Sequence, residues 1–368
     1  MTDMNISCNI TNFQKTVQTD QFSSFVLGAD VGGTRTNIAV AGIKEKKPTL
    51  LFSLDFQTKQ LFSFLPGLKQ TLEFAREKYN IQIKKGCIGA AGIVSADHSY
   101  VSLTNASWDI NTQELTEHTS MESLLILNDF QVLGYGLNTV DVNDENEVIC
   151  INKPSVQNEK KTRVLLGAGT GLGKSILRYD QQHDMYHASE SEGGHVDIPV
   201  YTDSELAVID AIRKRNHPGI PVCYEDVLSG DGLVDIYCYL HSVQRFPETR
   251  YSTEIESRKE KAELISKYRK VDDCCRETFR LFRMFFARCA KNLALEALAG
   301  GGVFIAGGIA QKNSEIINSS EFHQEFLRNY KREEFLKQTP LFLLKDYYIS
   351  LKGACFVAAN SSVIFQKK

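Results

Sequence analysis

Two glycine-rich segments carry residue types that suit phosphate binding. The first reads Asp30-Val-Gly-Gly-Thr34, and the second reads Gly167-Ala-Gly-Thr-Gly-Leu-Gly173. Glycine allows positive φ and has no Cβ, so backbone N–H groups in such turns can approach a phosphate closely, while Thr34 and Thr170 would add hydroxyl donors. Either segment alone could be a tight hairpin turn, which would need glycine in any case. In matching places of two similar halves of the chain, they together favour a shared phosphate site.

The second glycine-rich segment fits neither of two well-known phosphate motifs. A P-loop ending at Lys174-Ser175 requires glycine at position 168, where the chain has alanine, and the residues after Lys174 alternate like a strand. A dinucleotide fingerprint starting at Gly167 requires glycine at position 172, where the chain has leucine. We therefore expect Lys174 to be a solvent-facing strand residue, with contact to a phosphate as the less favoured alternative.

A third glycine pair, Gly307-Gly308, lies between a buried strand and a helix. The free N–H groups at a helix N-terminus favour anions or nucleotide edges. Close packing of the strand against the helix is the alternative explanation. Because two other turns already indicate phosphate, we assign this pair to the nucleotide as well.

The pair Asn128-Asp129 follows an apolar strand at Leu124 to Leu127. In α/β sheets, ligands gather at the carboxyl ends of strands. Asp129 could there accept a proton from an attacking hydroxyl. The alternative is that Asp129 caps a helix beginning at Phe130, and position alone favours the cap.

The segment Glu192-Gly-Gly-His195 places two polar side chains on either side of a backbone that only glycine permits. A carboxylate and an imidazole can accept from and donate to the neighbouring hydroxyls of a polyol. A metal site built from His183, His187 and His195 is disfavoured, because these spacings do not match the H-E-x-x-H pattern. Anchoring of the loop is an alternative role for the segment.

Three further residues are weak signals when taken singly. Glu225 lies just before the segment 227–232, which reads Val-Leu-Ser-Gly-Asp-Gly, and it could be an ordinary surface residue. Asn105 and Trp108 lie in Thr104-Asn-Ala-Ser-Trp108, where the tryptophan could simply fill the core.

Two α/β units must position these residues. Apolar runs at 25–31, 37–43 and 50–56 predict an antiparallel meander, followed by a helix over 61–79 and strands over 86–91 and 124–127. A similar order recurs with strands at 147–151, 164–166, 175–179, 303–306 and 341–344, and with helices at 204–213, 231–240, 256–268, 273–299 and 351–365. The chain therefore holds an approximate internal duplication.

Composition excludes several classes of protein. The 368 residues suggest two domains at ~150 residues each, and the net charge of -3 offers no basic field for nucleic acid or an anionic membrane surface. Charges interrupt every apolar run, so no transmembrane helix is expected. The nine scattered cysteines suggest neither disulfides nor zinc, and the polar segment 1–20 is no signal peptide. We expect a cytoplasmic protein, with the charged stretch 245–270 forming a solvated helical excursion.

Read together, the segments resemble the bacterial-type glucokinase family, within the superfamily of sugar kinases, actin and heat-shock ATPases. The resemblance runs from about residue 25 to 355. The matching pieces are, in order, DVGGT (30–34), TNASW (104–108), LNDF (127–130), GAGTGLG (167–173), SEGGHVD (191–197), EDVLSGDGL (225–233) and GGVFIAGGIA (301–310).

The resemblance implies two actin-like (ribonuclease-H-like) α/β domains with mixed sheets that flank a central cleft. The implied division is a flexible N-terminal extension at 1–24, a small domain at 25–138 plus 350–368, and a large domain at 139–349. The implied activity is transfer of a phosphoryl group from ATP to the 6-hydroxyl of D-glucose, with Mg2+. A homodimer is compatible with the resemblance, although the sequence does not fix the oligomeric state.

The resemblance also implies a role for each candidate residue. Asp129 would be the general base. The sugar would be bound by Asn105, Asn128, Asp129, Glu192, His195 and Glu225. The nucleotide would be bound by Asp30, Gly32, Gly33, Thr34, Gly169, Thr170, Gly171, Gly307 and Gly308. Asp30 would also hold magnesium through water.

The chain departs from the family pattern at two places. Arg35-Thr36-Asn37 stands where the family usually has Asn-Ala-Arg, and Lys174 stands where a small apolar residue is usual. Two other functions stay open: a kinase of another hexose, and a non-enzymatic sugar sensor on the same fold. Such sensors normally carry a DNA-binding helix-turn-helix, for which the segment 1–24 is too short.

Overall fold

The first sheet is built on the antiparallel meander that the sequence predicts. In a computed structural model, which describes residues 6–154 and 160–365, the meander consists of β2 (Ser24–Val31), β3 (Arg35–Lys44) and β4 (Lys47–Gln57). The strands β5 (Lys85–Ala90) and β9 (Ser123–Asn128) extend it in parallel to β2. The full strand order is β1-β4-β3-β2-β5-β9.

Part of the segment expected to be a flexible extension over 1–24 instead belongs to this sheet. Strand β1 (Cys8–Asn12) pairs antiparallel with β4, and a short 3-10 helix, η1 (Thr19–Gln21), follows it. Gln70 also fixes the segment, since its side chain accepts from the backbone N–H of Ile6 and donates to the Ile6 carbonyl. The strand carries little apolar surface, and Ile10 is exposed, so hydrophobic patterning gave no signal for it. Residues 1–5 lie outside the described residues.

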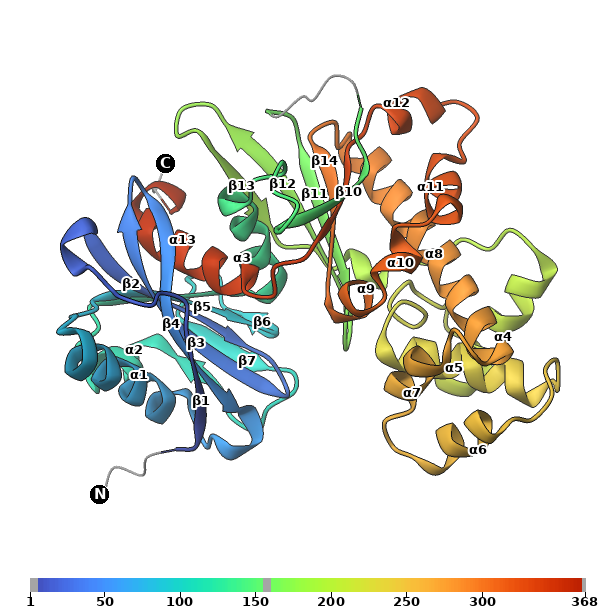
Figure 1. Cartoon of the computed structure of the whole chain (residues 1–368), viewed down its shortest axis with the longest axis horizontal. Coiled ribbons are helices and arrows are strands. Elements are labelled where there is room, and N and C mark those ends of the chain that lie inside the picture. The colour runs from blue at the N-terminus through green and yellow to red at the C-terminus, as the bar shows by residue number, and fades with distance from the viewer. Residues whose placement is uncertain (1–5, 155–159, 366–368) are drawn as a thin grey trace. The chain divides into compact units, whose positions relative to one another are not determined.

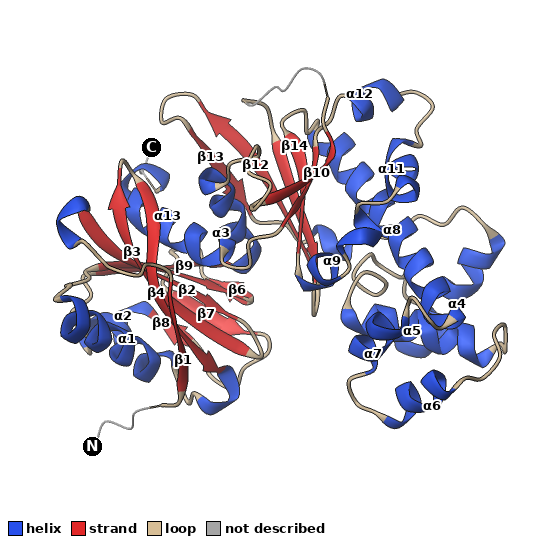
Figure 2. Cartoon of the chain, viewed as in Figure 1, coloured by secondary structure: helices blue, strands red, loops and turns tan. Residues whose placement is uncertain are grey.

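Helices cover both faces of the first sheet (Figure 2). Helices α1 (Phe64–Tyr79) and α2 (Thr112–Glu117) cover one face, and α3 (Asp129–Gly136) and α13 (Ile349–Ile364) cover the other. The C-terminal helix α13, red in Figure 1, lies directly against β2, where a Cβ on Gly28 would come within 2.6 Å of the Cys355 sulfur. The glycine therefore allows this helix to approach the sheet closely.

A small three-stranded sheet and two 3-10 helices complete this part of the chain. They are β6 (Gly92–Val94), β7 (Tyr100–Leu103), β8 (Ile110–Asn111), η2 (Thr58–Gln60) and η3 (Leu137–Thr139). The loop between β7 and β8 carries Asn105 and Trp108. Trp108 is buried in the hydrophobic core, as the alternative interpretation of this residue expects.

The second sheet repeats the plan of the first. Its strands are β10 (Val148–Asn152), β11 (Arg163–Ala168), β12 (Leu172–Asp180), β13 (Met185–Ser189), β14 (Gly302–Ala306) and β15 (Leu341–Leu344), in the order β10-β15-β14-β11-β12-β13. The strand β11 pairs antiparallel with β12 and parallel with β14, as β2 does with β3 and β5. The internal duplication is thus confirmed, with the two glycine-rich turns in equivalent positions.

Helices make up most of the remainder of the chain. They are α4 (Asp203–Asn216), α5 (Gly230–Ser242), α6 (Arg250–Ser257), α7 (Lys261–Tyr268), α8 (Asp273–Ala297), α9 (Gly308–Lys312), α10 (Ser314–Ile317), α11 (Ser320–Leu327) and α12 (Glu333–Lys337), together with the 3-10 helix η4 (Gly193–His195). Helix α8 begins after Asp272, whose carboxylate accepts from the Cys275 N–H at 2.9 Å, and ends at Leu298 in the left-handed conformation.

The expectation of one helix over 256–268 is wrong. Two short helices, α6 and α7, lie there with a break at 258–260, and α6 begins earlier because Thr249 and Ser252 form a capping box. The charged excursion is also not fully solvated, because Ile255, Ile265 and Tyr268 are buried in the core. Helices α10 to α12 had no counterpart among the expected elements.

A buried ion network joins three of these helices. The Arg288 guanidinium on α8 donates two hydrogen bonds to the Glu205 carboxylate on α4, at 2.8 and 2.9 Å, and one to Glu325 on α11 at 2.6 Å. All three side chains are less than 9 % exposed. Burial by itself would raise the pKa of Glu205, but the hydrogen bonds and charge of Arg288 hold it below its ordinary value.

The chain divides into two compact units. Of the described residues, those within Met1–Asp141, Arg178–Glu190 and Asp346–Lys368 form the first unit, and those within Val142–Leu177 and Ser191–Lys345 form the second. The boundaries expected from the sequence place 178–190 in the large domain, whereas this division places them in the first unit. In the described part of the chain, no helix is both long enough and apolar enough to cross a bilayer.

Candidate active site

The first glycine-rich turn joins β2 to β3 and lies against the loop that carries Asn105. The Gly32 N–H donates to the Arg35 carbonyl at 2.9 Å, and the Thr58 hydroxyl donates to the Gly32 carbonyl at 2.7 Å. A Cβ on Gly33 would come within 2.6 Å of the Asn105 Cβ. A predicted nucleotide residue and a predicted sugar residue are therefore in direct contact in the first unit.

Asp30 lies at the end of β2, next to this turn. Its Oδ2 accepts a hydrogen bond of 2.5 Å from the Ser350 hydroxyl at the start of α13. Burial raises the pKa of the Asp30 carboxyl, and the hydrogen bond from Ser350 lowers it in part. Sequence reasoning missed Ser350, because it is 320 residues away along the chain.

The cap of α3 is Asn128 and not Asp129. The Asn128 Oδ1 accepts from the backbone N–H groups of Phe130 at 3.0 Å and of Gln131 at 3.2 Å. Asp129 is instead the first residue of the helix, half-buried, and its Oδ1 accepts from the Phe130 N–H at 2.9 Å. The positive end of the helix dipole favours the ionised carboxylate at this position.

The turn Glu192–His195 lies flat on strand β12 in the second unit. A Cβ on Gly194 would fall well inside contact distance of the Leu172 carbonyl oxygen, and a Cβ on Gly193 would come within 2.9 Å of the Lys174 Cδ. Glycine is therefore required for this close approach. The Glu192 Oε2 and His195 Nε2 atoms lie 3.5 Å apart, and both side chains are exposed. The two polar groups are thus held together and available to a ligand.

Glu225 links this turn to the second glycine-rich turn. Its carboxylate accepts from the Leu172 N–H at 2.7 Å, and a Cβ on Gly171 would come within 2.6 Å of the same oxygen. Its backbone N–H donates to the Gly194 carbonyl at 3.0 Å. The interpretation of Glu225 as an ordinary surface residue is therefore wrong.

The glycines of the nucleotide candidates fall into two groups. Gly307 has φ of 91°, and a Cβ there would collide with the Ala168 backbone, so close packing explains this residue. A Cβ on Gly169 or Gly308 would meet nothing within 4 Å, so packing explains neither. Thr170 and Glu225 line a cavity of about 440 Å³ in the second unit, formed with the end of α4 and the start of α5.

Lys174 is buried, contrary to the expectation of a solvent-facing residue. Only 4 % of the residue is exposed, and its Nζ lies 4.6 Å from the centre of the Tyr224 ring. The alternating pattern of β12 indicated the strand correctly, but it could not show that the turn at 192–195 covers this face. Lys174 and Tyr224 are residues of the site that the sequence did not identify.

The described residues contain no group of three side chains suited to a metal. His183 and His187 each contact the Asp180 carboxylate, at 2.8 and 3.2 Å, and the hydrogen bond from His183 is the main reason that the pKa of Asp180 falls to about 2. All nine cysteines are free thiols, as expected.

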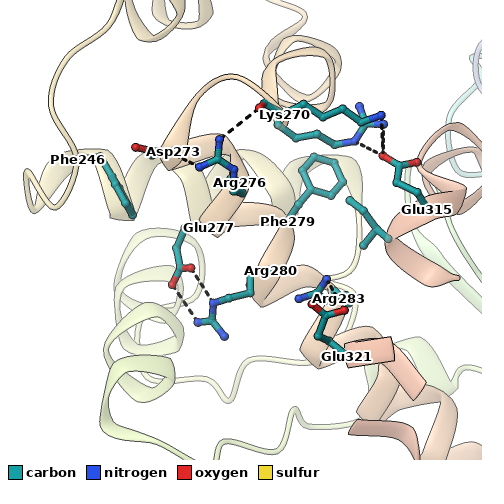
Figure 3. A pocket seen from close by; sticks show the side chains of 12 residues that line it. Phe246, Lys270, Asp273, Arg276, Glu277, Phe279, Arg280, Arg283, Glu315 and Glu321 are labelled. Atoms are coloured by element: carbon teal, nitrogen blue, oxygen red, sulfur yellow. Dashed lines mark hydrogen bonds and ion pairs between the residues drawn. The ribbon is translucent and has the colours of Figure 1, made fainter. Parts of the chain in front are cut away.

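A larger cavity, of about 660 Å³, lies on the surface of α8 and involves none of the predicted site residues (Figure 3). Its cations face carboxylates: Arg269 binds Glu315 at 2.5 Å, and Arg280 binds Glu277 at 2.7 Å. Because these charges are neutralised in pairs, the cavity shows no set of groups committed to a ligand.

Comparison with known proteins gives a consistent result. The Glucokinase family model matches residues 27–361. Glucokinase from Psychromonas ingrahamii is 29% identical over 330 residues, which cover 89% of this chain and 95% of the relative.

Solved structures show the same fold. Glucokinase from an Antarctic psychrotroph superposes with a TM-score of 0.74 at 25% identity, over 92% of this chain and 99% of the other. Glucokinase from Balamuthia mandrillaris in complex with glucose gives a TM-score of 0.76 at 21% identity, over 91% and 93% of the two chains. A ROK family glucokinase from Streptomyces griseus in complex with glucose and AMPPNP gives 0.59 at 16% identity, over 91% and 99%. The α/β fold with two mixed six-stranded sheets is therefore the fold of these sugar kinases.

Proposed function

The chain belongs to the glucokinase family, and from this premise we propose that it transfers the γ-phosphoryl group of ATP to the 6-hydroxyl of D-glucose, giving ADP and glucose 6-phosphate. One observation carries the proposal. In each half of the duplicated fold, a glycine of the phosphate-type turn contacts a residue of the sugar set, Gly33 with Asn105 and Gly171 with Glu225. Phosphoryl transfer requires this adjacency of phosphate and acceptor groups.

The sugar is recognised by side chains that suit its hydroxyls. Glu192 accepts and His195 donates or accepts, so the two groups, whose Oε2 and Nε2 atoms lie 3.5 Å apart, suit neighbouring hydroxyls on one ring. Asn128 uses its Nδ2 amide group, because its Oδ1 already accepts two backbone N–H groups of α3. Glu225 and Asn105 complete the set, and both lie against the glycine-rich turns.

Asp129 acts as the general base that takes the proton of the 6-hydroxyl. Asp129 lies in the first turn of α3, where the positive end of the helix dipole favours negative charge. General-base catalysis of this type contributes ~10²–10⁴ in rate. Most of the remaining acceleration comes from positioning and charge stabilisation, because phosphoryl transfer needs little covalent help.

The nucleotide is bound by backbone groups of the glycine turns. The open space where Cβ atoms of Gly169 and Gly308 would lie supports this assignment, since a phosphate or ribose edge can occupy it. The exposed Thr170 hydroxyl adds a donor, as does Thr34 in the first unit, where Gly32 and Gly33 supply the turn.

Asp30 would hold, through water, the magnesium ion that accompanies ATP. A carboxylate is the ligand that Mg2+ prefers, and the ion usually retains several waters, so one acidic residue at the end of β2 fits this role. When bound, the ion supplies neutralisation of the phosphate charge. The Ser350 hydrogen bond fixes the orientation of the Asp30 carboxylate.

A coupled assay of ADP release tests the function. We expect ADP release that depends on glucose and Mg-ATP, with glucose 6-phosphate as the product. A panel of hexoses at equal concentration separates a glucokinase from a kinase of another hexose, and glucose binding without ADP release would indicate a sugar sensor instead.

The variant Asp129→Ala tests the mechanism. Turnover should fall at least about a hundredfold, while glucose affinity changes far less. The exposed Asp97→Ala serves as the matched control and should leave both unchanged. Near-normal turnover of Asp129→Ala would remove this residue from the mechanism.

A further inference from the structure

We infer that Lys174 is a positioning residue for sugar binding: its buried side chain supports both the turn Glu192–His195 and the segment that carries Glu225. This inference rests on the proposed function, because it concerns the same sugar site. It assigns a role to a residue that neither a P-loop nor a surface position explains.

Burial of this lysine needs a reason. Lysine is rarely buried unless its ammonium is paired, and Lys174 is only 4 % exposed. In the described part of the chain, its ammonium faces the Tyr224 ring and the Cys289 thiol, and neither is a carboxylate. Burial raises the pKa of Cys289 to about 11, and the nearby Lys174 lowers it in part. If the side chain at position 174 only filled space in the interior, an apolar residue would be expected there.

The stem of Lys174 forms the floor beneath the sugar turn. Residues two apart on a strand share a face, so Leu172 and Lys174 point the same way from β12. Gly194 lies on the Leu172 carbonyl, and the Cβ position of Gly193 lies 2.9 Å from the Lys174 Cδ and 3.5 Å from its Nζ. The lysine stem therefore packs closely beneath the backbone between Glu192 and His195 and helps to set its position.

The ammonium of Lys174 fixes the other half of the sugar set. It lies over the Tyr224 ring, whose hydroxyl accepts from the Asn292 amide at 2.8 Å. The Tyr224 N–H donates to the Val196 carbonyl at 2.9 Å, so the Tyr224 segment pairs with the end of the turn. Glu225 is the next residue, and its N–H donates to the Gly194 carbonyl. The buried Lys174 side chain thus contacts both segments that carry the candidate sugar-binding carboxylates, Glu192 and Glu225.

Loss of the charge should act on the sugar and not on the nucleotide. The cation–π contact is stronger in a desolvated site than at the surface, and methionine has a similar length without the charge. Lys174→Met should therefore keep the packing beneath Gly193 and lose the cation–π contact with Tyr224. A Cβ on Gly169 or Gly308 would meet nothing within 4 Å, so neither of these nucleotide glycines packs against Lys174 or Tyr224 through that side.

The experiment compares Lys174→Met with Lys291→Met. Lys291 is a matched control because it is 3 % exposed, and its Nζ lies 5.5 Å from the Tyr201 ring. The measurements are KM for glucose, KM for ATP, kcat, the Kd for glucose by calorimetry without nucleotide, and the melting temperature. Lys174→Met should raise the glucose KM and Kd about tenfold and change the ATP KM less than twofold. Lys291→Met should change neither KM, although both variants lower the melting temperature.

A second variant covers the case in which Lys174→Met does not fold. Gly193→Ala pushes on the same contact from the turn and should also raise the glucose KM with little effect on the ATP KM. The inference is overturned if Lys174→Met loses stability while the glucose KM and Kd stay normal, or if both KM values rise equally. Failure of the proposed function would appear differently, as absence of glucose-dependent ADP release by the unaltered protein.

Discussion

Gly308→Ala should stabilise the protein and weaken ATP binding at the same time. Gly308 is the first residue of α9, its φ is not positive, and a Cβ there would meet nothing within 4 Å. Alanine is the better helix former and restricts the unfolded chain more than glycine does. We expect a gain of ~0.5–1 kcal/mol in the free energy of unfolding, and a melting temperature about 1–3 °C higher.

The unfavourable effect of Gly308→Ala should be on ATP binding and not on the stability of the free protein. A phosphate or ribose edge that contacts the Gly308 backbone would occupy the volume that the new methyl group fills. An ATP KM at least about tenfold higher corresponds to about 1.4 kcal/mol of lost binding. The glucose KM should change less than twofold, because no sugar candidate contacts this residue.

The assay is steady-state kinetics with each substrate varied in turn, together with thermal melts with and without Mg-ATP. Gly67→Ala in helix α1 is the matched control, since a Cβ there would lie 3.4 Å from Ile38 and Phe56 side-chain atoms. It should leave both KM values unchanged. If Gly308→Ala is stabilised and still binds ATP normally, Gly308 does not contact the nucleotide, and the assignment of its turn is refuted.

The remaining predictions concern the sugar turn, the buried ion network and Asp30. Gly194→Ala should raise the glucose KM at least about tenfold in steady-state kinetics, because displacement of a site by ~1 Å costs up to 10²-fold. Arg288→Met should lower the free energy of urea unfolding by about 3–5 kcal/mol, because it leaves the buried Glu205 without its cation and Glu325 with only the 3.5 Å ion pair to Arg328. Because the pKa of Glu205 is lower in the folded protein than its ordinary value of 4.5, this residue stabilises the fold at pH values above 4.5. Urea titrations should show that this stabilisation is lost as the pH falls through the pKa of the folded state. Ser350→Ala should raise the pKa of Asp30 and move the acid limb of the kcat/KM pH profile upward.

Each of these predictions can fail on its own measurement. A normal glucose KM for Gly194→Ala would show that the turn tolerates a Cβ or does not bind sugar. An unchanged unfolding energy for Arg288→Met would mean that the ion network contributes nothing net. If Arg288→Met shows the same acid dependence as the unaltered protein, Glu205 is not responsible for it. An unchanged kcat/KM pH profile for Ser350→Ala would show that ionisation of Asp30 does not control the acid limb.

The sequence predicted those elements whose signals are local. The meander strands alternate or form short apolar runs between turns, and β15 (Leu341–Leu344) was expected at the same residues. Helix α8 was located closely because its N-cap aspartate and the glycines after its end are local signals. The equivalence of the two glycine turns followed from their order along the chain.

Features that depend on contacts between distant segments could not be predicted. Strand β1 is held by backbone pairing to β4 and carries little apolar surface, so it left no pattern. Lys174 alternates like an exposed residue, and only the turn over it makes it buried. Asn128 and Asp129 are both good capping residues, and the sequence could not tell which of them ends the strand.

The first unit combines β2, near the start of the chain, with α13, near its end, so it can be completed only late in synthesis. The packing of Gly28 against Cys355 and the hydrogen bond from Ser350 to Asp30 form only after α13 has been translated. Ser350 follows Asp30 by 320 residues. Until α13 leaves the ribosome, the sheet face that it covers stays exposed as a sticky apolar surface. A chain that ends before residue 346 would lack the helix that covers this face, and we expect such a fragment to aggregate.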